Sequence, residues 1–175
     1  MGPGAEIGSL RSAATESPCV SKGEAGSVTV VDAVVPASGV RLVSRAPKTE
    51  QRVDLGAASV VIGVGRGIGS EENVGVAAGV AKALGAELAC SRPIAEGVGW
   101  LPKSRYLGVS GAVIQPDLYL ALGISGQVQH MVGVNGATTI VAINKAKSAP
   151  IFQHCDLGLV ADLSAALPTL EDQLS

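Results

Sequence analysis

The stretch that decides the fold is DLYLALGISGQVQH, residues 117–130. Its first half is apolar without interruption, which is typical of a parallel strand buried on both faces. Gly123, Ser125 and Gly126 then turn the chain into a predicted helix with a polar edge that ends at His130. The start of a helix presents unpaired backbone N–H groups and a partial positive charge, and a histidine adds a titratable hydrogen-bond donor. We therefore expect an anionic or carbonyl-rich ligand to bind at this turn.

On both sides of this stretch, short apolar runs alternate with helical segments. Strands are predicted over residues 58–64, 86–90, 117–124, 138–143 and 157–160. Helices are predicted over residues 71–84, 126–134 and 164–174; Gly85 caps the first, and Pro168 interrupts the last near its start. Residues 93–105 are predicted as a loop and residues 106–109 as a short extended segment. Strands that alternate with helices indicate a parallel sheet with right-handed crossovers. The predicted fold class is a single α/β domain with a doubly wound, Rossmann-like, three-layer arrangement.

The N-terminal third of the chain has a different composition. Residues 1–27 are rich in Gly, Ser, Ala and Glu, which predicts a flexible leader. Residues 28–56 contain β-branched runs and Pro47, and we interpret them as a strand remnant, with one strand over 27–32, followed by a linker. The main domain is predicted to cover residues 57–175.

Composition excludes several classes of protein. Of 175 residues, 47% are hydrophobic but only 2% are aromatic, so the core must consist of Val, Ala, Leu and Ile. A net charge of −2 gives no basic surface for nucleic acid. Three scattered cysteines and two histidines match no zinc or disulfide pattern, and they suit free thiols in a reducing compartment. No segment resembles a membrane span or a secretory signal, which predicts the cytoplasm and no membrane insertion.

Polar residues follow the ends of the predicted strands. Arg66 lies in a glycine-rich turn that contains neither G-x-G-x-x-G nor a P-loop lysine; Ser91-Arg92, Ser110 and Asn144 follow later strands. Because parallel strands end at one edge of the sheet, we expect these residues to meet in one crevice. Alone, the Arg66 turn favours a phosphate-binding loop over a solvated arginine, whereas Arg92 is equally compatible with a surface cation, and Ser110 and Asn144 with caps of turns or helices. Together they favour a site for an anionic, planar ligand. No residue is predicted to be catalytic, since no carboxylate pair or Ser/His/Asp set is present.

Five motifs carry a resemblance to a known family. They are VIGVGRG at 61–67, SRP at 91–93, GVSG at 108–111, GISGQVQH at 123–130 and IVAINK at 140–145. In order and spacing, residues 57–175 resemble the C-terminal FAD-binding domain of electron-transfer flavoprotein alpha subunits. The resemblance implies a Rossmann-like domain that holds one FAD.

The resemblance also implies roles for the matching residues. Arg66 would contact the phosphate or ribityl region, Arg92 would lie over the isoalloxazine and raise its reduction potential, and His130 would approach the flavin O2 carbonyl. Ser110 would lie near flavin N5, and residues 125–129 would bind the pyrophosphate and ribityl chain. Asn144, Asp156 and Leu157 would face the adenosine end. The full set assigned to FAD is Arg66, Ser91, Arg92, Gly108, Val109, Ser110, Gly111, Ser125, Gly126, Gln127, Val128, Gln129, His130, Asn144, Asp156 and Leu157.

The resemblance implies an electron carrier rather than a substrate-converting enzyme. It would accept electrons from acyl-CoA-type dehydrogenases, pass them to a downstream acceptor and pair with a beta subunit. The family carries a further N-terminal α/β domain, for which residues 1–56 are too few, and the sequence leaves open whether the chain is a fragment or naturally short. Two alternatives stay open: a truncated nucleotide-binding or assembly module of the same fold without tight FAD, and an NAD- or nucleotide-dependent oxidoreductase.

Overall fold

The computed structural model describes residues 29–30, 43–44 and 53–174. The chain divides into two units, Met1–Ala46 and Pro47–Ser175. Thr29 and Val30, the described part of the strand predicted over residues 27–32, lie in neither a helix nor a strand. The rest of the predicted leader and strand remnant lies outside the described residues, and these domain boundaries stay predictions.

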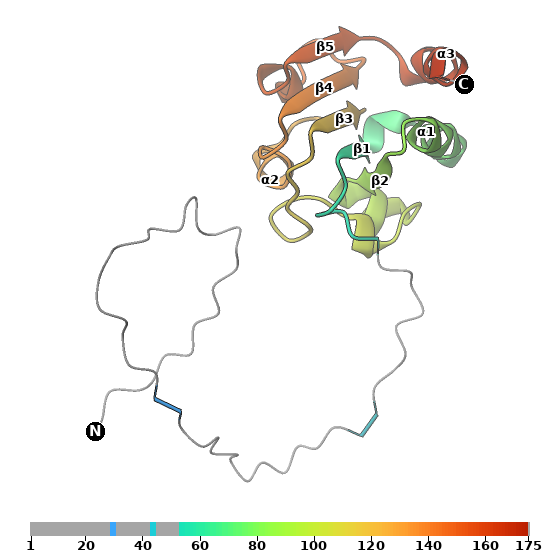
Figure 1. Ribbon diagram of the computed structural model, residues 1–175. Helices are drawn as coiled ribbons and strands as arrows, with labels where there is room; N and C mark the ends of the chain where they lie inside the picture. The colour runs from blue at the N-terminus through green and yellow to red at the C-terminus, as the bar shows by residue number, and fades with distance from the viewer. Residues whose placement is uncertain (1–28, 31–42, 45–52, 175) are drawn as a thin grey trace. The chain divides into compact units, whose positions relative to one another are not determined.

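The second unit is built on a five-stranded sheet in which every pairing is parallel (Figure 1). Its strands are β1 (Val60–Val64), β2 (Glu87–Cys90), β3 (Leu118–Leu122), β4 (Thr139–Asn144) and β5 (Leu157–Val160), in the spatial order β2-β1-β3-β4-β5. The chain places β2 on one side of β1 and then adds β3, β4 and β5 in turn on the other side. A crevice forms at the carboxyl ends of β1 and β3, where the winding direction reverses.

Helices cover both faces of this sheet (Figure 1). α1 (Glu71–Ala83) and α3 (Leu163–Leu174) lie side by side on one face, and α2 (Val128–Met131) lies on the other. Each face has its own apolar core: Ile62 and Leu122 belong to the first, Tyr119 and Met131 to the second. The predicted doubly wound α/β fold is therefore confirmed.

The ends of α1 follow from local chemistry. The Ser70 side chain accepts a hydrogen bond from the Asn73 N–H at 3.3 Å, so Ser70 is the N-cap. Glu71 and Glu72 in the first turn suit the positive end of the helix dipole. Gly85 has φ +62° just beyond the helix, as the sequence predicted.

Three local predictions were wrong. The segment predicted as a loop over 93–105 contains a π-helical turn, Pro93–Val98, and a 3₁₀ turn, Lys103–Arg105. A proline at the first helical position and Gly99 in the left-handed conformation set the limits of the π-helical turn. The short extended segment predicted over 106–109 is present in part, because Tyr106 has an extended backbone and Tyr106 and Leu107 form isolated parallel bridges. α2 is shorter than predicted, and α3 continues through Pro168 because that part of the helix is exposed and water can replace the lost backbone hydrogen bond.

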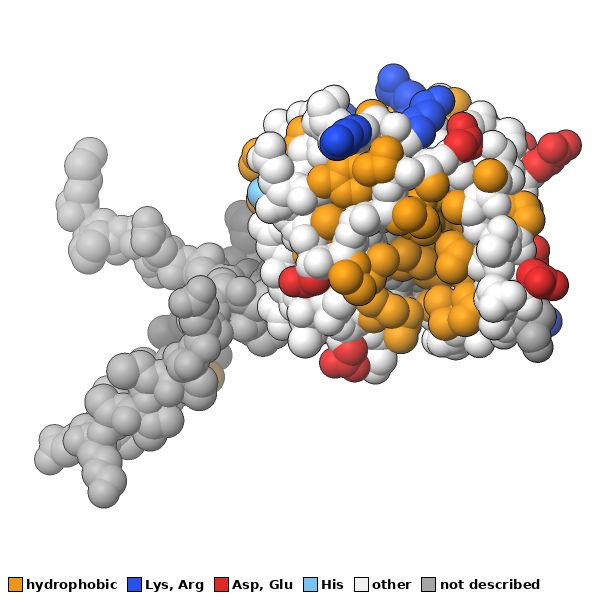
Figure 2. Space-filling view, turned by 90° about the horizontal axis from the view of Figure 1, so that it is seen from above, with side chains coloured by type: hydrophobic (Ala, Val, Ile, Leu, Met, Phe, Trp, Pro, Cys, Tyr) orange, Lys and Arg blue, Asp and Glu red, His pale blue; other side chains and the backbone are white. Residues whose placement is uncertain are grey.

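The edge strand β5 is exposed along its whole length. Leu157 is 65% exposed, and Leu159 and Val160 are each 51% exposed. Figure 2 shows apolar side chains gathered in a hollow on the face seen from above, the side on which β5 lies in Figure 1. Among the described residues, no helix combines the length and the apolar character needed to cross a bilayer.

Candidate functional site

A cavity of about 720 Å³ opens at the carboxyl edge of the sheet. The turns that follow β1, β2, β3 and β4 contribute to its wall, together with the segment that precedes β3. It therefore lies where the winding of the sheet reverses, which is the usual ligand crevice of such folds. The predicted site residues that line it are Arg66, Ser91, Arg92, Val109, Ser110, Ser125, Gln127, Gln129, His130 and Asn144.

The floor of the cavity is a close contact between two glycine turns. The Gly67 N–H donates to the Gly123 carbonyl at 3.0 Å, and the Gly65 N–H donates to the Leu122 carbonyl at 2.8 Å. A Cβ added at Gly67 would lie 2.8 Å from the Gly123 Cα, and Gly123 itself has φ +66°. The turns after β1 and β3 can approach this closely only because both lack side chains at these positions.

Asn144 joins two neighbouring turns of the wall. This residue is only 8% exposed, and its Nδ2 donates to the Ile124 carbonyl at 2.8 Å. Its Oδ1 accepts from the Ala146 N–H at 2.9 Å. The turns after β3 and β4 are therefore held in a fixed relation by one amide side chain.

The turn after β3 presents free backbone donors. None of the N–H groups from Ser125 to Gln129 has an acceptor in the described part of the chain, because α2 begins only at Val128. The first N–H groups of a helix have no partner within it. These donors are available to an acceptor that enters the cavity.

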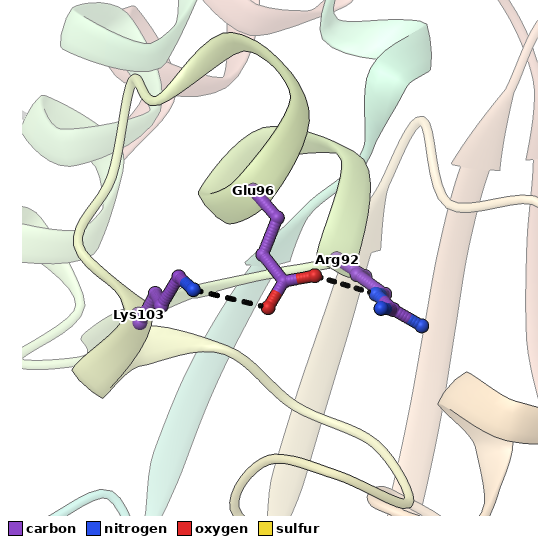
Figure 3. A network of polar contacts seen from close by, with 3 residues as sticks. All are labelled: Arg92, Glu96 and Lys103. Atoms are coloured by element: carbon purple, nitrogen blue, oxygen red, sulfur yellow. Dashed lines mark hydrogen bonds and ion pairs between the residues drawn. The ribbon is translucent and has the colours of Figure 1, made fainter.

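Cationic side chains lie at the rim. The Arg92 Nε donates to Glu96 Oε2 at 2.6 Å, and Lys103 Nζ lies 3.4 Å from Glu96 Oε1, so Glu96 bridges two cations (Figure 3). The hydrogen bond from Arg92, followed by that from Lys103, lowers the pKa of Glu96. This hydrogen bond uses only the Nε of Arg92, and no acceptor for its two terminal nitrogens is found among residues 53–174. Arg66 is exposed and has no ion-pair partner among residues 53–174.

His130 is buried against the cavity wall. It is 7% exposed, and its Nε2 lies 2.8 Å from the Tyr119 hydroxyl. Burial lowers the pKa of His130 to about 4, an effect only partly opposed by the Leu107 carbonyl, so the ring is neutral at pH 7. Its Nδ1 is buried without a hydrogen-bond partner in the described structure. Such a nitrogen is rare in native proteins and calls for an explanation.

Three predicted glycines shape the site without lining it. Gly108 (φ +139°) and Gly126 (φ +83°) adopt conformations that favour glycine, and a Cβ at either would collide with neighbouring backbone. A Cβ at Gly111 would collide with the Tyr106 carbonyl. Val128 is 70% exposed and does not line the cavity either.

Asp156 and Leu157 lie at the amino end of β5, whereas the cavity lies at the carboxyl edge of the sheet. The Asp156 carboxylate accepts a hydrogen bond from the Ile140 N–H at 2.7 Å, near the start of β4. The structure therefore does not bring this pair to the cavity. The assignment of this pair to FAD stays a prediction; it used a polar residue before a strand, whereas the residues that line the cavity mostly follow strands.

The cavity also contains residues that were not in the set assigned to FAD. Besides glycines 65, 67 and 123, they are Pro93, Tyr106, Leu107, Ile124, Ala146, Ser148, Ala149 and Pro150. The segment 146–150 follows β4, so the rule that predicted Asn144 applies to it as well. Tyr106 and Leu107 gave no signal, since they follow no strand.

The groups around the cavity are suited to binding an anionic ligand. The carboxylate beside the cavity, Glu96, is already paired with two cations. No group of three metal-ligating side chains occurs in the described ranges. What the cavity offers is free N–H donors, two arginines and a neutral imidazole, a set that matches an anionic ligand with carbonyl oxygens.

Comparison with known proteins agrees with this chemistry. Residues 54–135 match the family described as "Electron transfer flavoprotein FAD-binding domain". The protein named FixB from Salmonella typhi is 49% identical over 150 residues, which cover 86% of this chain and 48% of the relative. FixB from Escherichia coli O9:H4 (strain HS) gives the same identity and coverage. The chain spans about half the length of these relatives. The resemblance found in the sequence is confirmed.

Proposed function

Because residues 54–135 are a domain of the electron transfer flavoprotein FAD-binding type, we propose that the cavity at the carboxyl edge of the sheet holds FAD and that the chain carries electrons. The observation that carries the proposal is the convergence of free backbone donors, two arginines and an unpartnered imidazole nitrogen on one cavity. It is a donor set without a buried carboxylate, as an anionic dinucleotide requires.

The residues fit the chemical groups of FAD. The N–H groups from Ser125 to Gln129 suit pyrophosphate oxygens, because a helix start is electropositive and its donors are unpaired. Arg66 adds a free guanidinium at the rim, and a guanidinium can bind phosphate through two parallel hydrogen bonds. The unpartnered Nδ1 of His130 suits a carbonyl oxygen of the flavin ring.

Bound FAD supplies the redox chemistry, and the protein supplies orientation and electrostatics. Arg92, which Glu96 holds at the rim, places a permanent positive charge at the cavity and stabilises negative charge beside it. The Ser91 and Ser110 hydroxyls add hydrogen-bond partners, since both residues line the cavity. Asn144 contributes by holding two turns together, because its amide already bonds to both.

We further propose the biological setting that the family resemblance implies. The chain accepts electrons from an acyl-CoA-type dehydrogenase, passes them to a downstream acceptor and works with a beta subunit. The proposed compartment is the cytoplasm, which agrees with the free thiols of Cys90 and Cys155.

The proposal is tested by titrating the purified chain with FAD and following the visible absorption spectrum. We expect a shifted flavin spectrum and binding at micromolar FAD, with no competition from NAD. Arg66→Ala should weaken FAD binding by about tenfold, as expected for the loss of a charge-assisted hydrogen bond. Lys82→Ala, which removes an exposed charge from α1 outside the cavity, should leave the affinity for FAD unchanged. A folded chain that binds no FAD, or binds NAD better, contradicts the proposal.

A further inference from the structure

Tyr119 and His130 form a buried pair beneath the cavity. Tyr119 is the second residue of β3 and is wholly buried, and its hydroxyl lies 2.8 Å from His130 Nε2. Their rings are tilted by 39° with centroids 6.1 Å apart, so the contact is made through the polar atoms rather than by stacking. Tyr119 does not itself line the cavity.

Counting protons settles the direction of this hydrogen bond. A tyrosine hydroxyl has one proton, and the neutral imidazole has one N–H and one bare nitrogen. If Nε2 carried the proton, it would donate to Tyr119, and the hydroxyl proton would be left without an acceptor. No second acceptor for that hydroxyl exists among the described residues. If Tyr119 donates instead, Nε2 is the bare nitrogen and Nδ1 carries the ring proton.

The two arrangements differ in what they leave unpaired. In the first, the Tyr119 O–H and the bare His130 Nδ1 are both buried and unsatisfied. In the second, one group is unsatisfied, the Nδ1–H, and it belongs to a residue that lines the cavity. A buried donor without a partner is costly, so the arrangement with fewer such groups is the stable one. The Leu107 carbonyl lies near the ring and favours a proton on it. Nδ1 nevertheless has no partner with hydrogen-bond geometry in the described structure, so this proton still lacks an acceptor.

We propose that Tyr119 is a positioning residue that fixes His130 as the neutral Nδ1–H tautomer, so that the cavity presents a neutral donor to a carbonyl oxygen of its ligand. A phenyl ring would fill the core here as well as a tyrosine ring does, so packing alone does not explain the hydroxyl. A hydroxyl that sets the tautomer of a histidine gives the imidazole a defined function. The ligand is the acceptor that the Nδ1–H lacks.

The sheet makes room for this hydroxyl. Gly63 occupies the interior of β1, where glycine weakens a strand. A Cβ at Gly63 would overlap the Tyr119 hydroxyl and the ring carbons next to it. Gly63 therefore leaves space over β1 for the Tyr119 hydroxyl, which reaches His130. This explains why β1 contains a glycine, a residue that is unfavourable within a strand.

The tautomer is measured on the chain without any ligand, by ¹⁵N-labelling histidine and recording long-range ¹H–¹⁵N correlations at pH 7. The chain has two histidines, and His154→Gln removes the other set of signals. We expect His130 to show a protonated Nδ1 and a bare Nε2. A protonated Nε2 in the unaltered chain overturns the proposal, and this outcome depends on no variant of Tyr119.

Tyr119→Phe removes the hydroxyl and keeps the ring. The expected result is a gain of Nε2–H signal at His130, because the bare nitrogen has lost its donor, while the exposed His154 is unchanged. An unchanged His130 pattern in a folded Tyr119→Phe chain contradicts the role given to Tyr119. Circular dichroism serves as the control for folding.

The ligand-binding consequence rests on the proposed function and has its own measurement. Tyr119→Phe should weaken FAD binding by about tenfold, the usual size of one lost hydrogen bond, although Tyr119 does not line the cavity. Equal affinity for FAD in both chains overturns the claim that the tautomer serves the ligand. Failure of the unaltered chain to bind FAD overturns the proposed function, while the tautomer spectrum is still decided independently.

Discussion

At the scale of single residues, His130 makes the stability of this chain depend on pH. The pKa of its imidazole has the ordinary value of 6.5 in the unfolded chain and is about 4 in the folded chain, because burial disfavours the charged ring. Above pH 6.5 the ring is neutral in both states and has no effect. As the pH falls from 6.5 to 4, the unfolded chain binds a proton that the folded chain does not, so stability is lost, by roughly 3 kcal/mol in total.

We therefore predict a difference between the unaltered chain and His130→Gln that changes with pH. The free energy of unfolding, measured with urea at pH 7 and pH 4, should fall by roughly 3 kcal/mol more in the unaltered chain than in the variant. The carboxylates titrate equally in both chains, so they cancel in the comparison. A difference that stays constant with pH would show that His130 keeps its ordinary pKa.

Arg92 provides a second residue-scale prediction, for the chain with FAD bound. Arg92→Ala removes a positive charge from the cavity, so the bound flavin should become harder to reduce, with a potential lower by roughly 30 mV or more. Lys103→Ala is the matched control. Lys103 carries the same charge and bonds the same carboxylate, but it does not line the cavity. Equal shifts in the two variants would mean that Arg92 has no special position.

These residue placements could be predicted only in part. Arg66, Ser91, Ser125 and Asn144 were found because each follows a strand, and parallel strands end together. The Tyr119–His130 pair could not be predicted, because a tyrosine inside an apolar strand reads simply as core.

At the scale of elements, the site depends on the close backbone contact between the glycine turns that follow β1 and β3. Gly67 and Gly123 allow two backbones to meet at hydrogen-bond distance, and side chains at these positions would force the turns apart. The other glycines of the domain are not equivalent. Gly75 lies within α1, where an added Cβ would meet no atom within 4 Å.

This contrast gives a paired prediction with opposite signs. Gly67→Ala should destabilise the chain by about 2 kcal/mol or more, because the new methyl group would press on Gly123. Gly75→Ala should stabilise it by about 0.5–1 kcal/mol, because glycine is a poor helix former. Urea denaturation of both variants checks this, and destabilisation by Gly75→Ala or stabilisation by Gly67→Ala would contradict it.

The elements themselves were largely predictable. Apolar runs of four to six residues separated by helical segments gave the five strands β1 to β5 and helices α1 and α3. The turn Pro93–Val98 escaped prediction because it is a single short turn with two glycines nearby, whose geometry depends on packing. The continuation of α3 through Pro168 depends equally on its position at the surface.

At the scale of the whole molecule, one cavity gathers turns that lie far apart in the sequence. Arg66 follows β1 and Asn144 ends β4, yet both line the same space because the parallel sheet brings its carboxyl ends to one edge. Binding there couples to folding of the whole domain. FAD at a concentration of one hundred times its dissociation constant should raise the free energy of unfolding by about 2.7 kcal/mol.

The most direct test of the central claim, that FAD binds in this cavity, is amide hydrogen exchange of the full chain with and without FAD, read by mass spectrometry. The N–H groups from Ser125 to Gln129 have no acceptor in the described structure, so they should exchange rapidly in the free chain. Upon addition of FAD, we predict slower exchange in segments 65–67, 91–93 and 124–130. Bound FAD that leaves these segments unprotected, or protects the α1 surface around Lys82 instead, would contradict the account.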